Sequence, residues 1–262
     1  MEHIQLGNTG VQVPQIGLGT AKYEGGSQPL QTGIDLGAIL VDTAEAYGTE
    51  EAVGEAVRTI RDEVFIATKV SRTHFKHDDV ITACDQSLER LGTDHIDLYQ
   101  LHSPSTDIPI AETMGAMDKL VDDGKVRFIG VRNFSVAQLK EAQVVTRHGV
   151  VSNQVRYSLA DRSIEDELLP YCQENQVTVI AYSPLLGILG RLQTNLRTDI
   201  LTEVADAYNK TSAQVALNWC ISKVNVITIP KSNSVERTKE NCGASGWTLS
   251  PEQIKRLETA RG

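Results

Sequence analysis

The sequence has little cationic charge, few aromatic residues and no long apolar run. Its net charge of −9 disfavours a nucleic-acid-binding protein, because that class normally presents a basic patch or stripe. No run approaches the ~20 apolar residues of a membrane-spanning helix. The N-terminus, MEHIQLGNTG, has neither the basic start nor the apolar stretch of a secretory signal. We therefore expect a cytoplasmic protein that binds neither nucleic acid nor a membrane.

Cysteine and histidine are too scattered for a disulfide framework or a metal centre. The cysteines form no Cys-x-x-Cys pair, and the histidines form no His-Glu-x-x-His motif. Unpaired thiols are typical of a reducing compartment. We expect no metal and four free thiols, at Cys84, Cys172, Cys220 and Cys242.

What the chain does have is enough apolar material for a sizeable core. It is 40% hydrophobic over 262 residues, a length that suits one α/β barrel of roughly 250 residues. Short β-branched apolar runs alternate with longer amphipathic stretches, which favours parallel strands joined by helices. We find no linker, so residues 1–262 are predicted to form a single domain. The strand-like runs are Gln15–Gly19, Ile39–Asp42, Val64–Lys69, Ile96–His102, Val126–Asn133, Val150–Gln154, Val177–Ser183 and Val226–Lys231.

Turn and capping residues complete this plan. The turn Gly7–Gly10 predicts a hairpin between Ile4–Leu6 and Val11–Val13. Two helices fit between residues 183 and 226, and Pro251 opens a last one. Eight strand–helix repeats predict a (β/α)8 TIM barrel with an N-terminal β-hairpin and extra C-terminal helices. The competing open doubly wound sheet is disfavoured, because no Gly-x-Gly-x-x-Gly follows the first strand. Helix N-caps are expected at Ser135, Ser163 and Ser234.

Chemistry in such a barrel sits where the strands end and the loops to the helices begin. Most predicted strands end in a side chain that can hydrogen-bond or ionise. Each one alone has a structural explanation, such as capping the next helix, but their convergence on one rim favours a site. These residues are Thr20, Asp42, Lys69, His102, Asn133, Gln154, Tyr182, Ser183, Lys231 and Ser232, with Tyr47 shortly after Asp42.

Tyr47 has the chemistry of a proton donor whose strength its neighbours adjust. The ordinary tyrosine pKa near 10 makes it a weak acid at pH 7, and a Lys69 cation nearby is expected to lower that pKa. Asp42 would hold the lysine as a cation, and His102 can hydrogen-bond a carbonyl oxygen. The group suits carbonyl reduction, in which hydride reaches carbon and a proton reaches oxygen. No Ser-His-Asp or Cys-His grouping is visible for hydrolysis.

The hydride must come from a cofactor, and the end of the last strand offers a place for its phosphate. Lys231 and Ser232 lead into a helix that carries Arg237 and Lys239. A loop, a helix N-terminus, a lysine and an arginine make an anion site. A solvated basic helix face explains the same residues equally well.

Several short segments together match one known pattern, and on them the chain resembles the aldo-keto reductases over essentially its whole length. Each segment is individually modest, but jointly they are very specific. The segments are Gly17–Thr20, Asp42–Gly48 (Asp-Thr-Ala-Glu-Ala-Tyr-Gly), Ala67–Lys69, Asp97–His102, Ser152–Gln154, Ala181–Leu185 and Ile229–Ser232.

The resemblance implies a barrel that binds NADPH/NADP without a Rossmann fold and reduces small aldehydes and ketones to alcohols. It implies a monomer in which Tyr47 is the general acid, with Asp42, Lys69 and His102 completing a tetrad. The implied cofactor contacts are Thr20 on the rim, Asn133 and Gln154 at the nicotinamide carboxamide, Tyr182 on its ring, Ser183 and Leu185 at the pyrophosphate, Lys231, Ser232 and Arg237 at the 2′-phosphate, and Glu240 and Asn241 at the adenine.

Two positions depart from the family's pattern. Arg132 replaces the serine that helps to hold the carboxamide, and Ala21 stands where an aromatic residue often walls the substrate site. We therefore place Ala21 and Arg132 in the substrate pocket with Tyr47 and His102, and expect an open pocket. For Arg132 itself, we favour a side chain that swings out to solvent over one that stays in the site.

Two other functions stay open at the level of sequence. One is a lyase that uses Lys69 as a Schiff-base amine. Asp42 argues against it, because the carboxylate would keep the lysine protonated. The other is a redox-sensing protein that binds the cofactor and barely turns over, against which the complete tetrad argues.

Overall fold

The computed structural model, which describes residues 1–188 and 197–259, contains a closed eight-stranded parallel barrel. Neighbouring strands follow chain order, and parallel bridges from Ile16 to Thr228 and from Gly19 to Lys231 join the last strand to the first. The predicted (β/α)8 fold is therefore confirmed. The strands are β3 (Leu18–Gly19), β4 (Leu40–Asp42), β5 (Phe65–Val70), β6 (Ile96–Leu101), β7 (Val126–Arg132), β8 (Ser152–Arg156), β9 (Thr178–Tyr182) and β10 (Val226–Thr228).

Strand bounds differ from the prediction mainly where the barrel closes. The expected strand Gln15–Gly19 shortens to β3, and Val226–Lys231 shortens to β10. At this seam single bridges replace a continuous ladder, with the Gly17 N–H donating to the Thr228 carbonyl at 2.8 Å. Gly17 and Gly19 are needed there, because a Cβ on Gly19 would lie 2.6 Å from the Ile229 carbonyl oxygen.

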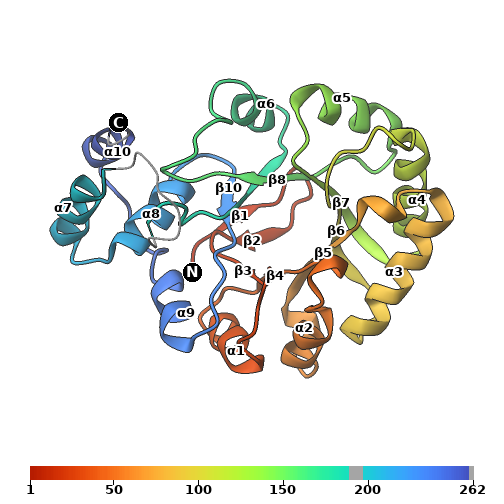
Figure 1. Ribbon diagram of the computed structural model, residues 1–262, viewed down its shortest axis with the longest axis horizontal. Coiled ribbons are helices and arrows are strands. Elements are labelled where there is room, and N and C mark those ends of the chain that lie inside the picture. Colours follow the sequence, from red (N-terminus) through yellow and green to blue (C-terminus); the bar gives the residue numbers. More distant parts are fainter. Residues whose placement is uncertain (189–196, 260–262) are drawn as a thin grey trace.

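The helices surround the barrel, with α1 to α6 forming an arc and α7 and α10 lying beyond α8 (Figure 1). Ser135 and Ser234 cap α5 and α9 as predicted, since each side chain accepts the N–H three residues on. The predicted cap at Ser163 is wrong, because its hydroxyl bonds Asp161 and α6 begins later. The helices are α1 (Ser27–Asp35), α2 (Glu50–Val57), α3 (His77–Leu91), α4 (Ile110–Asp122), α5 (Val136–Val145), α6 (Leu168–Glu174), α7 (Thr198–Tyr208), α8 (Ser212–Ile221), α9 (Val235–Cys242) and α10 (Pro251–Glu258).

The predicted N-terminal hairpin, β1 (His3–Gln5) and β2 (Gln12–Pro14), closes the amino end of the barrel. Leu6 and Val13 join the cluster of apolar side chains from the barrel strands, and the Gly7 N–H donates to Thr178 Oγ1 at 2.8 Å. One end of the barrel is therefore filled, which leaves the carboxyl ends of the strands for chemistry.

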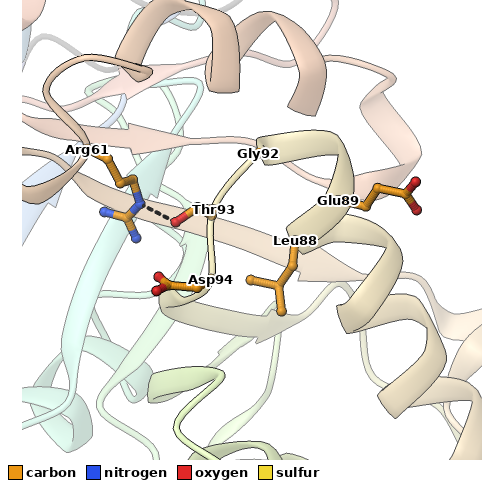
Figure 2. A pocket seen from close by; sticks show the side chains of 6 residues that line it. All are labelled: Arg61, Leu88, Glu89, Gly92, Thr93 and Asp94. Carbon is orange, nitrogen blue, oxygen red and sulfur yellow. Dashed lines mark hydrogen bonds between the residues drawn. The ribbon is translucent and has the colours of Figure 1, made fainter.

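A shallow hollow near the amino end of β6 is lined by an arginine whose guanidinium is already hydrogen-bonded to its neighbours. Figure 2 shows Arg61 directed at Thr93, whose hydroxyl accepts from Nε at 2.9 Å. Arg61 also donates to Asp97 at 2.9 Å, and the same carboxylate accepts from the Ile66 N–H. This cluster ties β5 to β6 at the end of the barrel away from the polar rim.

The predicted state of the cysteines is confirmed. All four are buried and unpaired, and burial raises the pKa of the Cys84 and Cys172 thiols to about 12. Within the described part of the chain, no helix is long and apolar enough to cross a membrane.

Candidate active site

The rim is built round a buried ion pair between Asp42, at the end of β4, and Lys69 in β5. Lys69 Nζ donates to Asp42 Oδ1 at 2.6 Å and to the Thr43 carbonyl at 2.7 Å. Both side chains are almost wholly buried. Burial lowers the pKa of Lys69, while the Asp42 carboxylate opposes that shift. The lysine is therefore held in place and has no surface open to a substrate.

Tyr47 and His102 complete the predicted group at the barrel mouth. Tyr47 ends the short 3-10 helix η1 (Glu45–Tyr47) and is half-buried, and His102 follows directly after β6. Lys69 Nζ lies 4.9 Å from the centroid of the Tyr47 ring. The Tyr47 and His102 rings meet edge to face, with centroids 5.4 Å apart. Three strand ends and one turn thus bring the four residues together.

The prediction that Lys69 lowers the pKa of Tyr47 is wrong. Burial raises the pKa of Tyr47 above its ordinary value, Asp42 raises it further, and Arg132 acts in the opposite direction. Asp42, which pairs with Lys69 at 2.6 Å, acts on Tyr47 in the direction opposite to a lysine cation. The tyrosine therefore keeps its proton at ordinary working pH, as a proton donor must.

Burial, helped by Lys69 and Arg132, lowers the pKa of His102 from 6.5 to about 4. The imidazole is therefore neutral above about pH 5, and Tyr47 holds its proton throughout this range. We expect kcat/KM for carbonyl reduction to stay flat between about pH 5.5 and about pH 8.5. A pH–rate profile measures this. An inflection near pH 6.5 that disappears in His102→Asn would contradict the neutral histidine.

Two glutamines support Asp42 from neighbouring strands. Gln154 Nε2 donates to Asp42 Oδ2 at 2.7 Å, and Gln100 Nε2 lies 3.4 Å from the same oxygen. The amide nitrogen of Gln154 therefore already donates to Asp42. The predicted contact of Gln154 with a carboxamide stays a prediction. Gln100 was missed by sequence reasoning. The sequence does contain a clue to Gln100, because side chains two apart in a strand share a face and Gln100 is two residues before His102.

Glu45, two residues before Tyr47, is a second residue that the sequence did not reveal. Its carboxylate accepts from the Ser71 N–H and lies 3.1 Å from His74 Nδ1. It therefore fastens the turn that carries Tyr47 to the segment after β5. No spacing rule distinguishes such a glutamate from a solvated one.

Asn133 and Thr20 take different places on the rim. Asn133 is exposed and left-handed, with φ 59°, and its N–H donates to the Gln154 carbonyl. Asn153, another residue not predicted, holds this loop by donating to the Phe134 carbonyl at 2.9 Å. Thr20 is wholly buried, and its hydroxyl donates to the Asp42 carbonyl at 2.9 Å. Thr20 thus supports the end of β4, and its predicted contact with a cofactor stays a prediction.

The predicted phosphate residues gather where β10 runs into α9. Ser232 Oγ donates to the Ser234 carbonyl at 2.9 Å, and Ser234 in turn caps the helix by accepting the Arg237 N–H. Arg237 is exposed, and Lys231 is half-buried beside Gly19 of β3. At the other end of this helix Glu240 is half-buried and Asn241 is buried.

The remaining predicted residues lie between these two groups or at the opening. Tyr182 ends β9 half-buried, and Ser183 follows it, exposed and left-handed with φ 52°. Leu185 packs against the core. Ala21 is exposed, and its place in an open substrate pocket stays a prediction.

Arg132 does not swing out to solvent, so the favoured expectation for it is wrong. Its Nη1 donates to the His102 carbonyl at 3.2 Å, and its guanidinium carbon lies 4.4 Å from the centroid of the Tyr182 ring. The pleat of β7 explains this, because residues two apart share a face and Phe128 already packs inside the barrel.

This set of groups fits a nicotinamide dinucleotide phosphate. The exposed amide of Asn133 is what a carboxamide requires. The half-buried Tyr182 ring, which also contacts Arg132 at 4.4 Å, is an aromatic surface of the kind on which a nicotinamide stacks. The cations Lys231 and Arg237 flank a helix N-terminus, which is what a phosphate requires. The donor chemistry along the ends of β7 to β10 therefore suits NADP(H).

The sequence pattern of the aldo/keto reductase family matches residues 15–261. The chain belongs to the aldo/keto reductase family. It is 40% identical to methylglyoxal reductase YeaE of Escherichia coli K12, over 95% of this chain and 92% of that protein. It is 35% identical to glyoxal reductase of Bacillus subtilis, over 96% and 90%. A crystal structure of an aldo/keto reductase from Klebsiella pneumoniae in complex with NADP and acetate is 40% identical, with a TM-score of 0.90 over 97% and 93%.

This aldo/keto reductase is an NADP(H)-dependent oxidoreductase that reduces carbonyl groups, as the sequence predicted. The family match covers the barrel from just before β3 to beyond α10, and therefore includes every strand that carries a site residue.

Proposed function

We propose that this reductase converts small aldehydes and ketones to alcohols with Tyr47 as the general acid. The observation that carries the proposal is the position of Tyr47. Its ring lies over the buried Lys69 ammonium and against the His102 ring, and its pKa is raised. When bound, NADPH supplies the hydride that reaches the carbonyl carbon.

The four residues of the tetrad have different roles in the reaction. Tyr47 gives its proton to the carbonyl oxygen, and neutral His102 supplies an N–H to the same oxygen, because its pKa of about 4 leaves it uncharged. Asp42 and Lys69 form a buried ion pair that supports the tyrosine from beneath. Tyr47 is half-buried, so water can return the proton after each turnover.

Small 1,2-dicarbonyl compounds are the first substrates to test, because two relatives carry the names methylglyoxal reductase and glyoxal reductase. Steady-state NADPH oxidation over a panel of carbonyl compounds tests the function directly. Tight NADPH binding with no turnover of any of them would instead favour a redox-sensing protein.

We propose that Arg237 and Lys231 hold the 2′-phosphate of NADPH. Charge-assisted hydrogen bonds contribute about 1.5–3 kcal/mol, so Arg237→Ala should weaken NADPH binding about tenfold or more and leave NADH binding unchanged. Calorimetric titration of both cofactors measures this. Lys239→Ala is the matched control, because that exposed cation stands about 200° further round the same helix. Equal losses in both variants would contradict the assignment.

The lyase alternative loses support from access. A Schiff base needs an amine that a substrate carbonyl can reach, and Lys69 has no exposed surface and donates two short hydrogen bonds. Borohydride trapping in the presence of a carbonyl compound should therefore give no adduct at Lys69.

A further inference from the structure

Arg132 lies inside the mouth of the barrel. In β7 the residues Phe128, Gly130 and Arg132 share the inward face, since side chains two apart point the same way. Phe128 packs with the interior cluster, and a Cβ on Gly130 would lie 2.6 Å from Ser152 Oγ, in the barrel interior. The next side chain along this face, Arg132, therefore rises directly above the filled part of the barrel.

The positive charge of the Arg132 guanidinium is less well paired with carboxylates than the charges of two other partly buried arginines. Arg61 pairs with Asp97 at 2.9 Å. Arg90 pairs with Glu50 at 2.7 Å. Over residues 1–188 and 197–259, no carboxylate lies within 4.0 Å of Arg132, and its buried Nε has no hydrogen-bond partner. Leaving a buried donor on a permanent cation unpaired costs free energy, so an anion that accepts a hydrogen bond from Nε would stabilise this position.

The missing anion belongs at the reacting end of the site. Arg132 donates to the His102 carbonyl and lies on the Tyr182 ring. Its charge lowers the pKa of both Tyr47 and His102, although burial and Asp42 dominate the shift of the tyrosine. A group bound by Arg132 is therefore close to the proton donor. The chain as a whole has a net charge of −9, so this positive site is a local feature.

We propose that Arg132 binds a carboxylate of the substrate, so that the enzyme prefers oxo acids to neutral carbonyl compounds of the same shape. The guanidinium fork matches a carboxylate with two parallel hydrogen bonds, and Nε supplies one of them. The carboxylate is not consumed; hydride and proton still add across the carbonyl group. This inference rests on the proposed function, because it names the substrate class of that same site.

The substrate is a better source of the anion than the cofactor. The phosphate residues Lys231, Ser232 and Arg237 gather at β10 and α9, whereas Arg132 ends β7 beside His102. The resemblance to the family nevertheless implies that this position faces the nicotinamide carboxamide. Holding the cofactor is therefore the competing role for Arg132, and the experiment separates the two.

The test compares pairs of aldehydes that differ in charge and hardly in shape. The pairs are 3-formylbenzoate with 3-formylbenzamide, and 4-formylbenzoate with 4-formylbenzamide. We expect the parent to favour the carboxylate of at least one pair in kcat/KM, and Arg132→Gln to reduce that preference at least about tenfold. The preference is the ratio of kcat/KM for the acid to kcat/KM for the amide within one variant, so a loss that both substrates share cancels. The Kd of NADPH should change less than about threefold. Arg132→Lys, which keeps the charge without the fork, should retain part of the preference.

Arg156→Gln is the matched control. That arginine also lies near the Tyr182 ring, at 5.9 Å, but it is more than half exposed and has Asp161 at 3.9 Å. Its loss should change the charge preference less than about twofold, and a loss as large as that of Arg132→Gln would overturn the proposal. An unchanged preference in Arg132→Gln would overturn it as well. Equal losses for acids and amides with weaker NADPH binding would assign Arg132 to the cofactor instead.

Binding measurements keep this result separate from the proposed function. Titration of the NADP-loaded protein with 4-(hydroxymethyl)benzoate and its amide reports the preference without turnover. If the parent reduces none of the aldehydes yet binds the acid more tightly through Arg132, the proposed function fails and the anion site stands. If the acid and the amide bind equally to parent and variant, the anion site fails.

Discussion

Tyr47→Phe should lower kcat for carbonyl reduction by about 10²–10⁴-fold, because the change removes only the hydroxyl that supplies the proton. The ring contacts with Lys69 and His102 should survive. NADPH binding and the unfolding temperature should therefore stay close to those of the parent. Initial rates with NADPH and with its deuterated form, which reveal whether hydride transfer limits turnover, provide the measurement.

A matched tyrosine distinguishes this effect from the loss of any hydroxyl. Tyr171 donates its hydroxyl to Gln143 Oε1 at 2.7 Å in the outer layer of helices. Tyr171→Phe should leave kcat unchanged. If Tyr47→Phe retained near-normal turnover while hydride transfer was rate-limiting, another group would be the proton donor.

Lys69→Met should destabilise the protein by about 3–5 kcal/mol and also abolish most activity. The substitution leaves the Asp42 carboxylate buried, with only amide donors from Gln154 and Gln100 in place of its cation. An uncompensated buried charge is costly in a way that a missing hydrogen bond is not. Urea denaturation followed by circular dichroism gives the free energy of unfolding.

The double variant Asp42→Asn with Lys69→Met separates stability from catalysis. Removing both charges leaves no unpaired ion, so much of the lost stability should return. Activity should not return, because the Asp42–Lys69 ion pair beneath Tyr47 is gone. A cost below about 1 kcal/mol for Lys69→Met alone would mean that the pair is not buried as its geometry indicates.

The sequence determined the barrel and the composition of its rim. Buried, mainly apolar runs such as those of β5 and β6, repeated eight times in alternation with helices, predict a parallel barrel, and turn chemistry at Gly7–Gly10 predicts the hairpin. Since all parallel strands end on the same side, polar residues such as Asp42 and Lys69 had to meet there. These are local patterns, which the amino-acid sequence carries by itself.

Tertiary structure decided the charges and the directions of the side chains. The pKa of Tyr47 rises because burial and Asp42 outweigh the opposing charge of Arg132, and this balance depends on distances that no spacing encodes. Gln154 turns its amide to Asp42, and Arg132 turns inward onto Tyr182. Each of these outcomes depends on which groups approach from other strands, and electrostatic energies change steeply with separation and burial. The sequence therefore determined which residues share the rim, and only packing between strands decided which of them are paired, charged or available to a substrate.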